Sequence, residues 1–334
     1  MILVTGGTGL VGSHLLFKLT SQNNQVRVIF RNRNKIADVK KVFAYYSADY
    51  KSLFQKIEWF SADILDFESL QKAFEGITEV YHCAALVAIG GISKSTLIHN
   101  NVQGTENIVN LSLDNSIKKL CYISSIASLG EPETPTSISE KEKWSTSKNR
   151  SAYSVSKYKS EMEVWRGIQE GLNAVIVNPS VILGAGFWES GSGSLFTKAA
   201  KGINYYTTGG TGFVDVRDVA DIMIRLMNSN ISSERFILNS ENLTYKQLFD
   251  LIAEKMNVAK PKRKATKTLL QVANILDCIA SSLKIKKREI TSDVVRSSLS
   301  ISEYSNTKIK ETLDYNFIPI SKSLEDIAHK FRIG

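Results

Sequence analysis

The stretch Thr5-Gly6-Gly7-Thr8-Gly9-Leu10-Val11-Gly12 follows a short β-branched run at residues 2–5 and leads into a helical pattern at residues 10–21. Two glycine patterns overlap in it, GxGxxG at residues 7–12 and TGxxGxxG at residues 5–12. Glycines at these spacings permit a tight turn and let backbone N–H groups approach a pyrophosphate. The anion would lie at the positive end of the following helix. Because the strand–turn–helix context is present, the stretch predicts a dinucleotide-binding site.

Short apolar runs alternate with helical patterns through the first half of the chain. We expect strands at residues 2–5, 26–30, 57–60, 79–83, 119–124 and 174–178, and helices that include residues 10–21, 93–114 and 152–170. This alternation predicts an α/β fold in which helices cover both faces of a parallel sheet. Right-handed crossovers then favour a Rossmann-type doubly wound parallel sheet.

Other segments interrupt this alternation. Residues 131–149 are polar and contain two prolines, which predicts a surface loop. Residues 183–194 carry four glycines around Phe187 and Trp188 and are expected to form a mobile segment over a pocket. Helical patterns at residues 245–256, 266–284 and 324–331 predict a smaller, mostly helical C-terminal lobe. We therefore assign residues 1–181 and 213–240 to the dinucleotide-binding domain, and residues 182–212 and 241–334 to a substrate-binding lobe.

Composition fits an ordinary globular protein, with 334 residues of which 43% are hydrophobic and 22% are charged. The cysteines at 83, 121 and 278 form no CxxC pair, so we expect neither a disulfide framework nor a metal site. We also expect no targeting segment, no transmembrane segment, no nucleic-acid partner and a cytoplasmic location. The longest apolar stretch, residues 269–285, is interrupted by polar side chains and is too short to span a bilayer.

The positive charge is unevenly distributed. The chain has a formal net charge of +9, and much of the excess lies at residues 260–267 and 284–288, on both sides of the amphipathic stretch 269–285. Two interpretations stay open: an ordinary solvated surface, or a contact with a membrane surface or another anionic partner.

The end of the second expected strand bears on the choice of dinucleotide. A site for NAD places an acidic residue there, on the ribose 2′-hydroxyl. This chain has Arg31 instead, with Arg33 two positions later. Guanidinium groups suit a 2′-phosphate, so we expect NADP, with NAD as the alternative.

The pair Tyr153 and Lys157 occupies positions i and i+4 of an expected helix, on one face. A phenol has a pKa of roughly 10, too high for ready proton exchange near neutrality. A nearby ammonium, together with the positive charge of an oxidised nicotinamide, would lower that pKa. Tyr153 could then give a proton to a carbonyl oxygen or accept one in the reverse direction.

A pair of serines, Ser124 and Ser125, ends the strand expected at residues 119–124. Ligands of open α/β sheets bind at the carboxyl ends of the strands. A serine hydroxyl there could hydrogen-bond a substrate carbonyl and stabilise the charge that develops on it. Serines also end strands because they favour turns, so the pair alone is weak support for catalysis.

Eight ordered motifs give the chain a resemblance to the extended short-chain dehydrogenases/reductases. The chain is similar to the NAD-dependent epimerase/dehydratase group, and within it to the dihydroflavonol-4-reductase-like branch. The motifs are VTGGTGLVG (4–12), ADI (62–64), HCAA (82–85), NVQGT (101–105), ISS (123–125), YSVSK (153–157), NPSVILG (178–184) and FVDVRDVA (213–220).

The resemblance implies roles for individual residues. In the catalytic set, Ser125 takes the place of the serine, with Ser124 as its less favoured neighbour. Tyr153 is the proton donor or acceptor, and Lys157 also holds the nicotinamide ribose. The cofactor-binding set comprises the phosphate loop (Gly6, Thr8, Gly9, Leu10, Val11 and Gly12), the ribose-side Arg31, the adenine-flanking Asp63 and Ile64, Cys83, Ala84 and Ala85 after the fourth strand, Asn101, Tyr153, Lys157, and Pro179, Ser180 and Val181 at the nicotinamide end.

Departures from the family pattern favour one activity within it. Sugar-nucleotide epimerases usually carry Arg-Asp before the aromatic residue of the FVDVRDVA motif, and this chain has Thr211-Gly212. Residues 86–89 form an apolar run after the fourth strand. We therefore expect an NAD(P)-dependent reductase of apolar or aromatic carbonyl compounds, and a sugar-nucleotide epimerase or dehydratase is the alternative, in which Lys201 or Arg217 would have to supply positive charge.

Further expectations follow from the same resemblance. A non-catalytic dinucleotide sensor is disfavoured because both Tyr153 and Lys157 are kept. In the FVDVRDVA motif, Asp215, Arg217 and Asp218 are interpreted as capping and packing residues. Family members are often homodimers through two helices of the dinucleotide domain, and residues 93–114 and 152–170 are the candidates. The partner is expected to be a small-molecule carbonyl or hydroxyl substrate.

Overall fold

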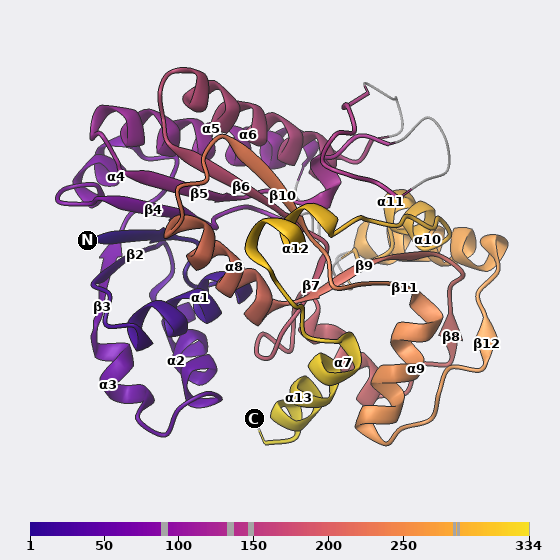
Figure 1. Cartoon of the computed structure of the whole chain (residues 1–334). Helices are drawn as coiled ribbons and strands as arrows, with labels where there is room; N and C mark the ends of the chain where they lie inside the picture. Colours follow the sequence, from indigo (N-terminus) through magenta and orange to yellow (C-terminus); the bar gives the residue numbers. More distant parts are fainter. Residues whose placement is uncertain (88–92, 132–136, 146–149, 283–284, 286–287, 334) are drawn as a thin grey trace.

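A seven-stranded parallel sheet forms the centre of the computed structural model, which describes residues 1–87, 93–131, 137–145, 150–282, 285 and 288–333 (Figure 1). The strand order is β10-β6-β5-β4-β1-β2-β3. The strands are β1 (Ile2–Thr5), β2 (Val26–Phe30), β3 (Ile57–Ser61), β4 (Glu79–His82), β5 (Lys119–Ile123), β6 (Ala174–Pro179) and β10 (Glu234–Leu238). All neighbouring pairs are parallel, with Ile2 aligned on Val26 in β2 and on Glu79 in β4.

Both faces of this sheet are apolar and buried, as the near-continuous hydrophobic strands predict. One core contains the even-numbered Ile2 and Val4 of β1 and is covered by α1 (Leu10–Ser21), α2 (Ile36–Ala44) and α8 (Val216–Met227). The other contains Leu3 and is covered by α4 (Phe67–Ala73), α5 (Lys94–Asp114) and α6 (Ala152–Gln169). Figure 1 shows α5 and α6 along one face and α1 and α8 on the other.

The strand order reverses between β1 and β4, which are neighbours although β2 and β3 lie between them in the chain. The chain runs outward from β1 to β3, then crosses to β4 and continues to β10. In open α/β sheets, ligands bind outside the carboxyl ends of the strands at this point. A ligand site is therefore expected at the loops after β1 and β4.

A smaller region packs beside the carboxyl ends of the strands. It holds a three-stranded sheet of β7 (Val181–Leu183), β9 (Gly210–Asp215) and β11 (Glu241–Thr244), and a two-stranded sheet of β8 (Tyr205–Tyr206) and β12 (Arg263–Lys264). Its apolar core joins α7 (Gly193–Ala200), α9 (Tyr245–Met256) and α13 (Ile320–Ile333). The remaining helices are α3 (Tyr50–Gln55), α10 (Lys267–Ser282), α11 (Ser292–Ser297) and α12 (Thr307–Leu313).

The predicted strands and helices are confirmed, most of them within one or two residues of their expected ends, whereas α13 begins at Ile320, four residues before the expected start at residue 324. Sequence reasoning missed β10 and the three-stranded sheet. Residues 183–194 pack more firmly than expected: the Trp188 ring lies edge-on to Phe331 at 5.0 Å, and its indole N–H donates to the Tyr45 hydroxyl at 3.2 Å. The half-buried Trp188 side chain thus contributes to packing between Tyr45 and α13, and the mobile segment over a pocket stays a prediction.

Several predictions fall partly outside the described residues. These are residues 88 and 89 of the apolar run after β4, residues 132–136 and 146–149 of the expected loop, and residues 283, 284, 286 and 287 near the second basic patch. In the described part of the loop, Ile138 is buried and pairs with Tyr304, so the segment is anchored and not simply a surface loop. In the parts of the chain that the structure describes, no helix has the length and apolar character to cross a membrane.

Candidate functional site

The glycine loop between β1 and α1 is pressed against the loop that follows β4. Gly6 has φ +68°, and a Cβ there would lie 2.6 Å from the backbone of Cys83 and Ala84. A Cβ on Gly12 would lie 2.3 Å from the Gly6 carbonyl oxygen. Backbone packing thus requires glycine at both positions.

At Gly9, by contrast, backbone packing does not require glycine, and the space beside it is open. Among the described residues, a Cβ there would meet just the Gly6 carbonyl oxygen, at 3.4 Å, which is ordinary contact. Gly9 is the N-cap of α1 and gives the helix no side-chain cap. Thr8, Leu10 and Val11 are half-buried around it. The loop therefore leaves a small open cradle at the positive end of a helix, and it fits the pyrophosphate that the sequence predicts.

The segment after β4 is held in place by Asn101 from α5. The Asn101 amide accepts from the Leu86 backbone N–H at 2.7 Å and donates to the Leu86 carbonyl at 3.0 Å. It also donates to the Ser156 hydroxyl on α6, at 3.1 Å. Cys83, Ala84 and the following alanine at 85 are thereby placed at the carboxyl edge of the sheet, half-buried beside the glycine loop. These contacts give Asn101 a structural role beside the predicted cofactor site.

The residues predicted to meet the adenosine lie after β2 and β3. Arg31 is largely exposed, and its guanidinium approaches the Asp63 carboxylate at 3.6 Å. Asp63 also accepts from the Leu65 backbone N–H at 3.1 Å. Ile64 lies against α5, where Asn107 donates to its carbonyl at 2.8 Å. Arg31 and Asp63 thus lie side by side after the carboxyl ends of β2 and β3, and they carry opposite charges.

Tyr153 and Lys157 lie on the first turns of α6, beside the end of β5. Ser151 caps this helix by accepting from the Ser154 backbone N–H at 3.0 Å. The Lys157 ammonium donates to the Ile123 carbonyl at 2.8 Å and is almost fully buried. The Ser125 hydroxyl accepts from the Ala127 backbone N–H at 3.1 Å and lies close enough to the Tyr153 phenol to lower its pKa. Three residues predicted from two separate motifs therefore meet at one place.

Burial dominates the protonation behaviour of this group. It raises the pKa of Tyr153, and the nearby Ser125 hydroxyl offsets part of that rise. Burial also lowers the pKa of Lys157 to about 8, although the charge of Glu161 acts in the opposite direction. The protein alone therefore does not give Tyr153 the lowered pKa expected from the sequence; that would need the positive charge of an oxidised nicotinamide.

A buried carboxylate, Glu161, lies one helical turn beyond Lys157 and was missed by sequence reasoning. Its Oε2 accepts from Ser124 at 2.5 Å, from Ser128 at 2.7 Å and from Asn178 at 2.8 Å. Its Oε1 accepts from Arg235 of β10 at 3.1 Å. One carboxylate thus joins α6 to the ends of β5 and β6 and to β10. Its spacing of four from Lys157 is the signal that could have drawn attention to it.

This cluster distinguishes the two neighbouring serines. Ser124 is 2% exposed and donates to Glu161, so its hydroxyl is used in packing. The Ser125 side chain is half-buried, and its carbonyl accepts from Ser128 at 2.7 Å and from Asn178 at 3.2 Å. The cluster therefore holds the Ser125 backbone while its hydroxyl turns toward Tyr153. This favours Ser125 over Ser124 as the residue that meets a substrate.

The residues after β6 lie on the same edge. Pro179 ends β6, and the Ser180 hydroxyl donates to the Leu238 carbonyl of β10 at 3.1 Å. Val181 begins β7 and is half-buried. Ser180 is thus tied to the fold, and its side chain is less available to a ligand than the sequence pattern implies.

The charged residues of the FVDVRDVA motif hold α8 and the C-terminal region together. Asp215 caps α8 and accepts from both the backbone and the guanidinium of Arg217. Arg217 also pairs with Asp326 of α13 at 2.8 Å. Asp218 accepts from the Tyr315 hydroxyl at 2.9 Å. These contacts fit the predicted capping and packing roles.

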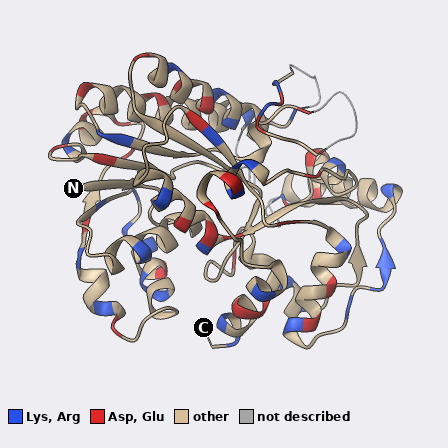
Figure 2. Ribbon diagram, viewed as in Figure 1, with Lys and Arg blue, Asp and Glu red and all other residues tan. Residues whose placement is uncertain are grey.

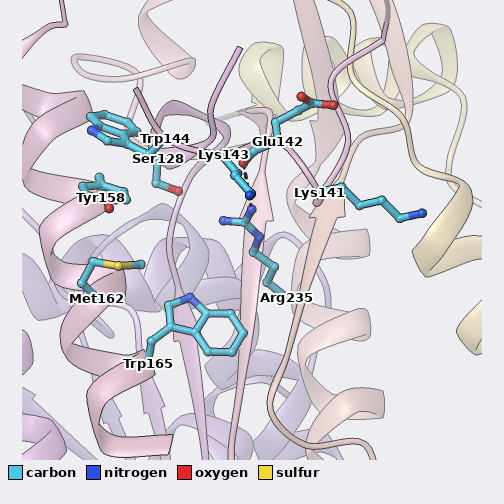
Figure 3. A pocket seen from close by; sticks show the side chains of 9 residues that line it. All are labelled: Ser128, Lys141, Glu142, Lys143, Trp144, Tyr158, Met162, Trp165 and Arg235. Atoms are coloured by element: carbon cyan, nitrogen blue, oxygen red, sulfur yellow. Dashed lines mark hydrogen bonds between the residues drawn. The ribbon is translucent and has the colours of Figure 1, made fainter. Parts of the chain in front are cut away.

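A hollow of about 490 Å³ lies on the far side of the Glu161 cluster (Figure 3). Along α6 it is lined by Tyr158, Met162 and Trp165, and Ser128 and Arg235 contribute to it from the cluster itself. None of the predicted catalytic or cofactor residues lines it. The hollow therefore lies apart from the carboxyl edge described above.

Comparison with known proteins gives a family match over most of the chain. The model of the NAD dependent epimerase/dehydratase family matches residues 2–238. A Synechocystis sp. protein with the provisional name dihydroflavonol 4-reductase is 26% identical, over 98% of this chain and 94% of its own. Sterol demethylase protein B of Methylococcus capsulatus is 27% identical, over 80% of this chain and 78% of its own.

Solved structures share the fold over the full length. The structure of gox2253 has a TM-score of 0.81 at 27% identity and covers 100% of this chain and 98% of its own. Yeast methylglyoxal/isovaleraldehyde reductase Gre2, complexed with NADPH, has a TM-score of 0.74 at 16% identity, over 98% of this chain and 97% of its own. UDP-glucose 4-epimerase of Thermotoga maritima, with UDP-glucose, has a TM-score of 0.76 at 21% identity. The match covers 99% of this chain and 98% of its own.

Proposed function

Since the chain belongs to the NAD dependent epimerase/dehydratase family of extended short-chain dehydrogenases/reductases, and is therefore an NAD(P)-dependent enzyme, we propose that it reduces the carbonyl of an apolar or aromatic small molecule. The observation that carries the proposal is the meeting of Ser125, Tyr153 and Lys157 at the carboxyl edge of the sheet. The Gly9 cradle and the loop after β4 lie on the same edge.

Each catalytic residue has a distinct part in the proposal. When bound, the nicotinamide dinucleotide supplies the hydride in reduction and accepts it in oxidation. Ser125 binds the substrate oxygen, and Tyr153 gives that oxygen a proton. Lys157 keeps a positive charge beside the phenol, and because an ammonium has three donors it can bind a ribose while donating to Ile123.

The choice of an apolar substrate rests on how the charged residues are used. A sugar-nucleotide diphosphate would need cationic side chains, and Arg217 is engaged by Asp215 and Asp326. Thr211-Gly212 supplies no charge before the aromatic residue of the motif. Val87, in the segment fixed by Asn101, is 53% exposed. These features support a carbonyl compound without phosphate groups.

A substrate panel tests the proposal directly. With NADPH and with NADH, we expect oxidation of the cofactor when aromatic and aliphatic ketones and aldehydes are supplied, and no turnover of UDP- or dTDP-sugars. The readout is the loss of reduced-cofactor absorbance, with product analysis of the sugar reactions. Epimerised or dehydrated sugar products would support the alternative activity and contradict the reductase.

We also propose NADP as the preferred dinucleotide, on the basis of Arg31. Replacing Arg31 by alanine should weaken NADPH binding by roughly ten- to a hundredfold, as expected for the loss of a charge-assisted hydrogen bond, and change NADH binding little. Binding is measured by fluorescence titration. Lys40→Ala, which removes a nearby exposed charge on α2, is the control. An unchanged NADPH-to-NADH ratio in Arg31→Ala would contradict this choice.

Three further predictions accompany this proposal. They are a dinucleotide-binding domain of residues 1–181 and 213–240 with a substrate lobe formed by the rest, a homodimer through α5 and α6, and a cytoplasmic location. The packing of α7, α9 and α13 into a separate apolar core supports a distinct lobe, while Ile309 and Tyr315 of residues 241–334 pack into the core of the central sheet.

A further inference from the structure

The helix α10 presents an apolar face to solvent. Five apolar residues recur along it at the spacing of one helical face, and all five are exposed. They are Leu269 (41% exposed), Val272 (48%), Ile275 (58%), Leu276 (61%) and Ile279 (52%). Single exposed apolar residues are normal, but a continuous stripe of five marks a surface that another body covers.

Two polar residues of α10, Asn274 and Asp277, point the other way, into the protein. Asp277 is 2% exposed and accepts from the backbone N–H groups of Glu289 and Ile290, both at 2.8 Å. Asn274 accepts from Arg288 at 3.2 Å. A helix that belonged to an ordinary soluble surface would have the reverse arrangement. The hydrogen bonds of Asp277 fix this orientation, so the apolar face cannot turn inward without breaking them.

Positive charge is concentrated in the sequence on both sides of this helix. Residues 260–288 contain nine lysines and arginines and one acid, Asp277, so this stretch carries eight of the nine excess charges of the chain. Figure 2 shows basic residues on β12, which holds Arg263 and Lys264, and at the neighbouring end of α10. The next acid, Glu289, is paired with Lys198 at 2.9 Å. The described residues at the N-terminal side of the apolar stripe, on β12 and at the start of α10, are therefore cationic.

We propose that α10 docks on an anionic lipid bilayer and lies in its surface. The apolar face would enter the boundary between headgroups and acyl chains, and the basic residues at its ends would meet lipid phosphates. A second copy of the chain would bring two strongly positive stretches together, whereas an anionic membrane complements them. Nucleic acid would match the charge but would leave the apolar face exposed. The proposal does not rest on the reductase activity.

Vesicle co-sedimentation of the full chain tests the proposal. Binding to phosphatidylcholine vesicles that contain phosphatidylglycerol should exceed binding to phosphatidylcholine alone by at least about tenfold, and should weaken as salt is raised. Leu276→Glu combined with Ile279→Glu should lower binding to the anionic vesicles by at least about tenfold. The control is Ile333→Glu, at a 66% exposed position at the end of α13, which should bind as wild type does.

The fold of each variant is checked by thermal unfolding, and serine in place of glutamate at 276 and 279 serves as the gentler pair. Equal binding to both vesicle types, or anionic binding that survives both pairs of changes, overturns the proposal. So does a dimer in sedimentation velocity that the α10 changes convert to a monomer without any vesicle binding, since a second copy would then cover the face. If the chain binds an RNA or DNA duplex and the changes at 276 and 279 do not affect that binding, the basic residues bind nucleic acid and the proposal is overturned.

Discussion

Replacing Tyr153 by phenylalanine is expected to lower kcat for carbonyl reduction by roughly two to four orders of magnitude and to leave dinucleotide affinity nearly unchanged. The substitution removes one oxygen and keeps the ring that is packed at the start of α6. The Ser125 hydroxyl loses its phenol partner but remains placed by its own backbone contacts. The substitution removes the phenolic hydroxyl, which is the group proposed to transfer the proton. Steady-state turnover and cofactor titration, measured on the same preparation, separate the two quantities.

Tyr158 on the same helix provides the matched control. Its ring stacks on Trp144 at 4.2 Å beside the hollow of Figure 3, away from the carboxyl edge. Tyr158→Phe should therefore keep kcat within about twofold of wild type, as expected for a change away from the reacting atoms. If Tyr153→Phe retains near-normal turnover while Tyr158→Phe also does, another group moves the proton and the proposed catalytic set is wrong.

The sequence predicts the sheet well because its signals are local. The phosphate loop and the apolar strands each depend on residues within a few positions of one another, and parallel strands put their carboxyl ends at one edge. That is why the amino-acid pattern alone predicts that residues as far apart as Gly9, Ala84, Ser125 and Lys157 lie on the same edge.

The parts that could not be predicted depend on contacts distant in sequence. The role of Glu161 depends on its hydrogen bonds with Ser124, Asn178 and Arg235. These three residues lie in separate strands or strand ends, far from Glu161 in the sequence. The strand that carries Arg235 was itself not predicted. Trp188 resembled a pocket residue because its neighbours are glycines, but α13 supplies the packing partner Phe331. The orientation of α10 likewise follows from backbone groups beyond the helix, which hold Asp277 inside.

Glu161→Gln is the change expected to combine a large loss of stability with a specific change in catalysis. The described hydrogen-bonding partners of both carboxylate oxygens are donors, so an amide would turn its own N–H₂ toward one of them. Leaving a buried donor unpaired costs roughly 1–3 kcal/mol, and the charge of Arg235 would lose its partner as well. We expect the free energy of unfolding to fall by roughly 2–4 kcal/mol, measured by denaturant titration.

The catalytic effect of Glu161→Gln should act through Lys157 and Ser125. Glu161 raises the pKa of Lys157 against the effect of burial, so its neutralisation should lower that pKa below about 8. Lys157 is charged below its pKa and neutral above it. The alkaline limb of the kcat/KM profile should therefore move to lower pH, and kcat should fall by about ten- to a hundredfold as Ser125 loses its fixed position.

Glu163→Gln on the same helix is the matched control for this change. Glu163 pairs with Arg166 at 2.9 Å on the solvent side, where an ion pair contributes at most about 1 kcal/mol. Its replacement should leave the pH profile and kcat as in wild type. A Glu161→Gln enzyme that unfolds more easily but keeps the wild-type alkaline limb and kcat would make Glu161 a purely structural residue. A shifted limb, in contrast, requires the buried carboxylate to act electrostatically on Lys157, four positions before it. The control substitution removes an equal charge two residues away, which is partly exposed and paired with Arg166.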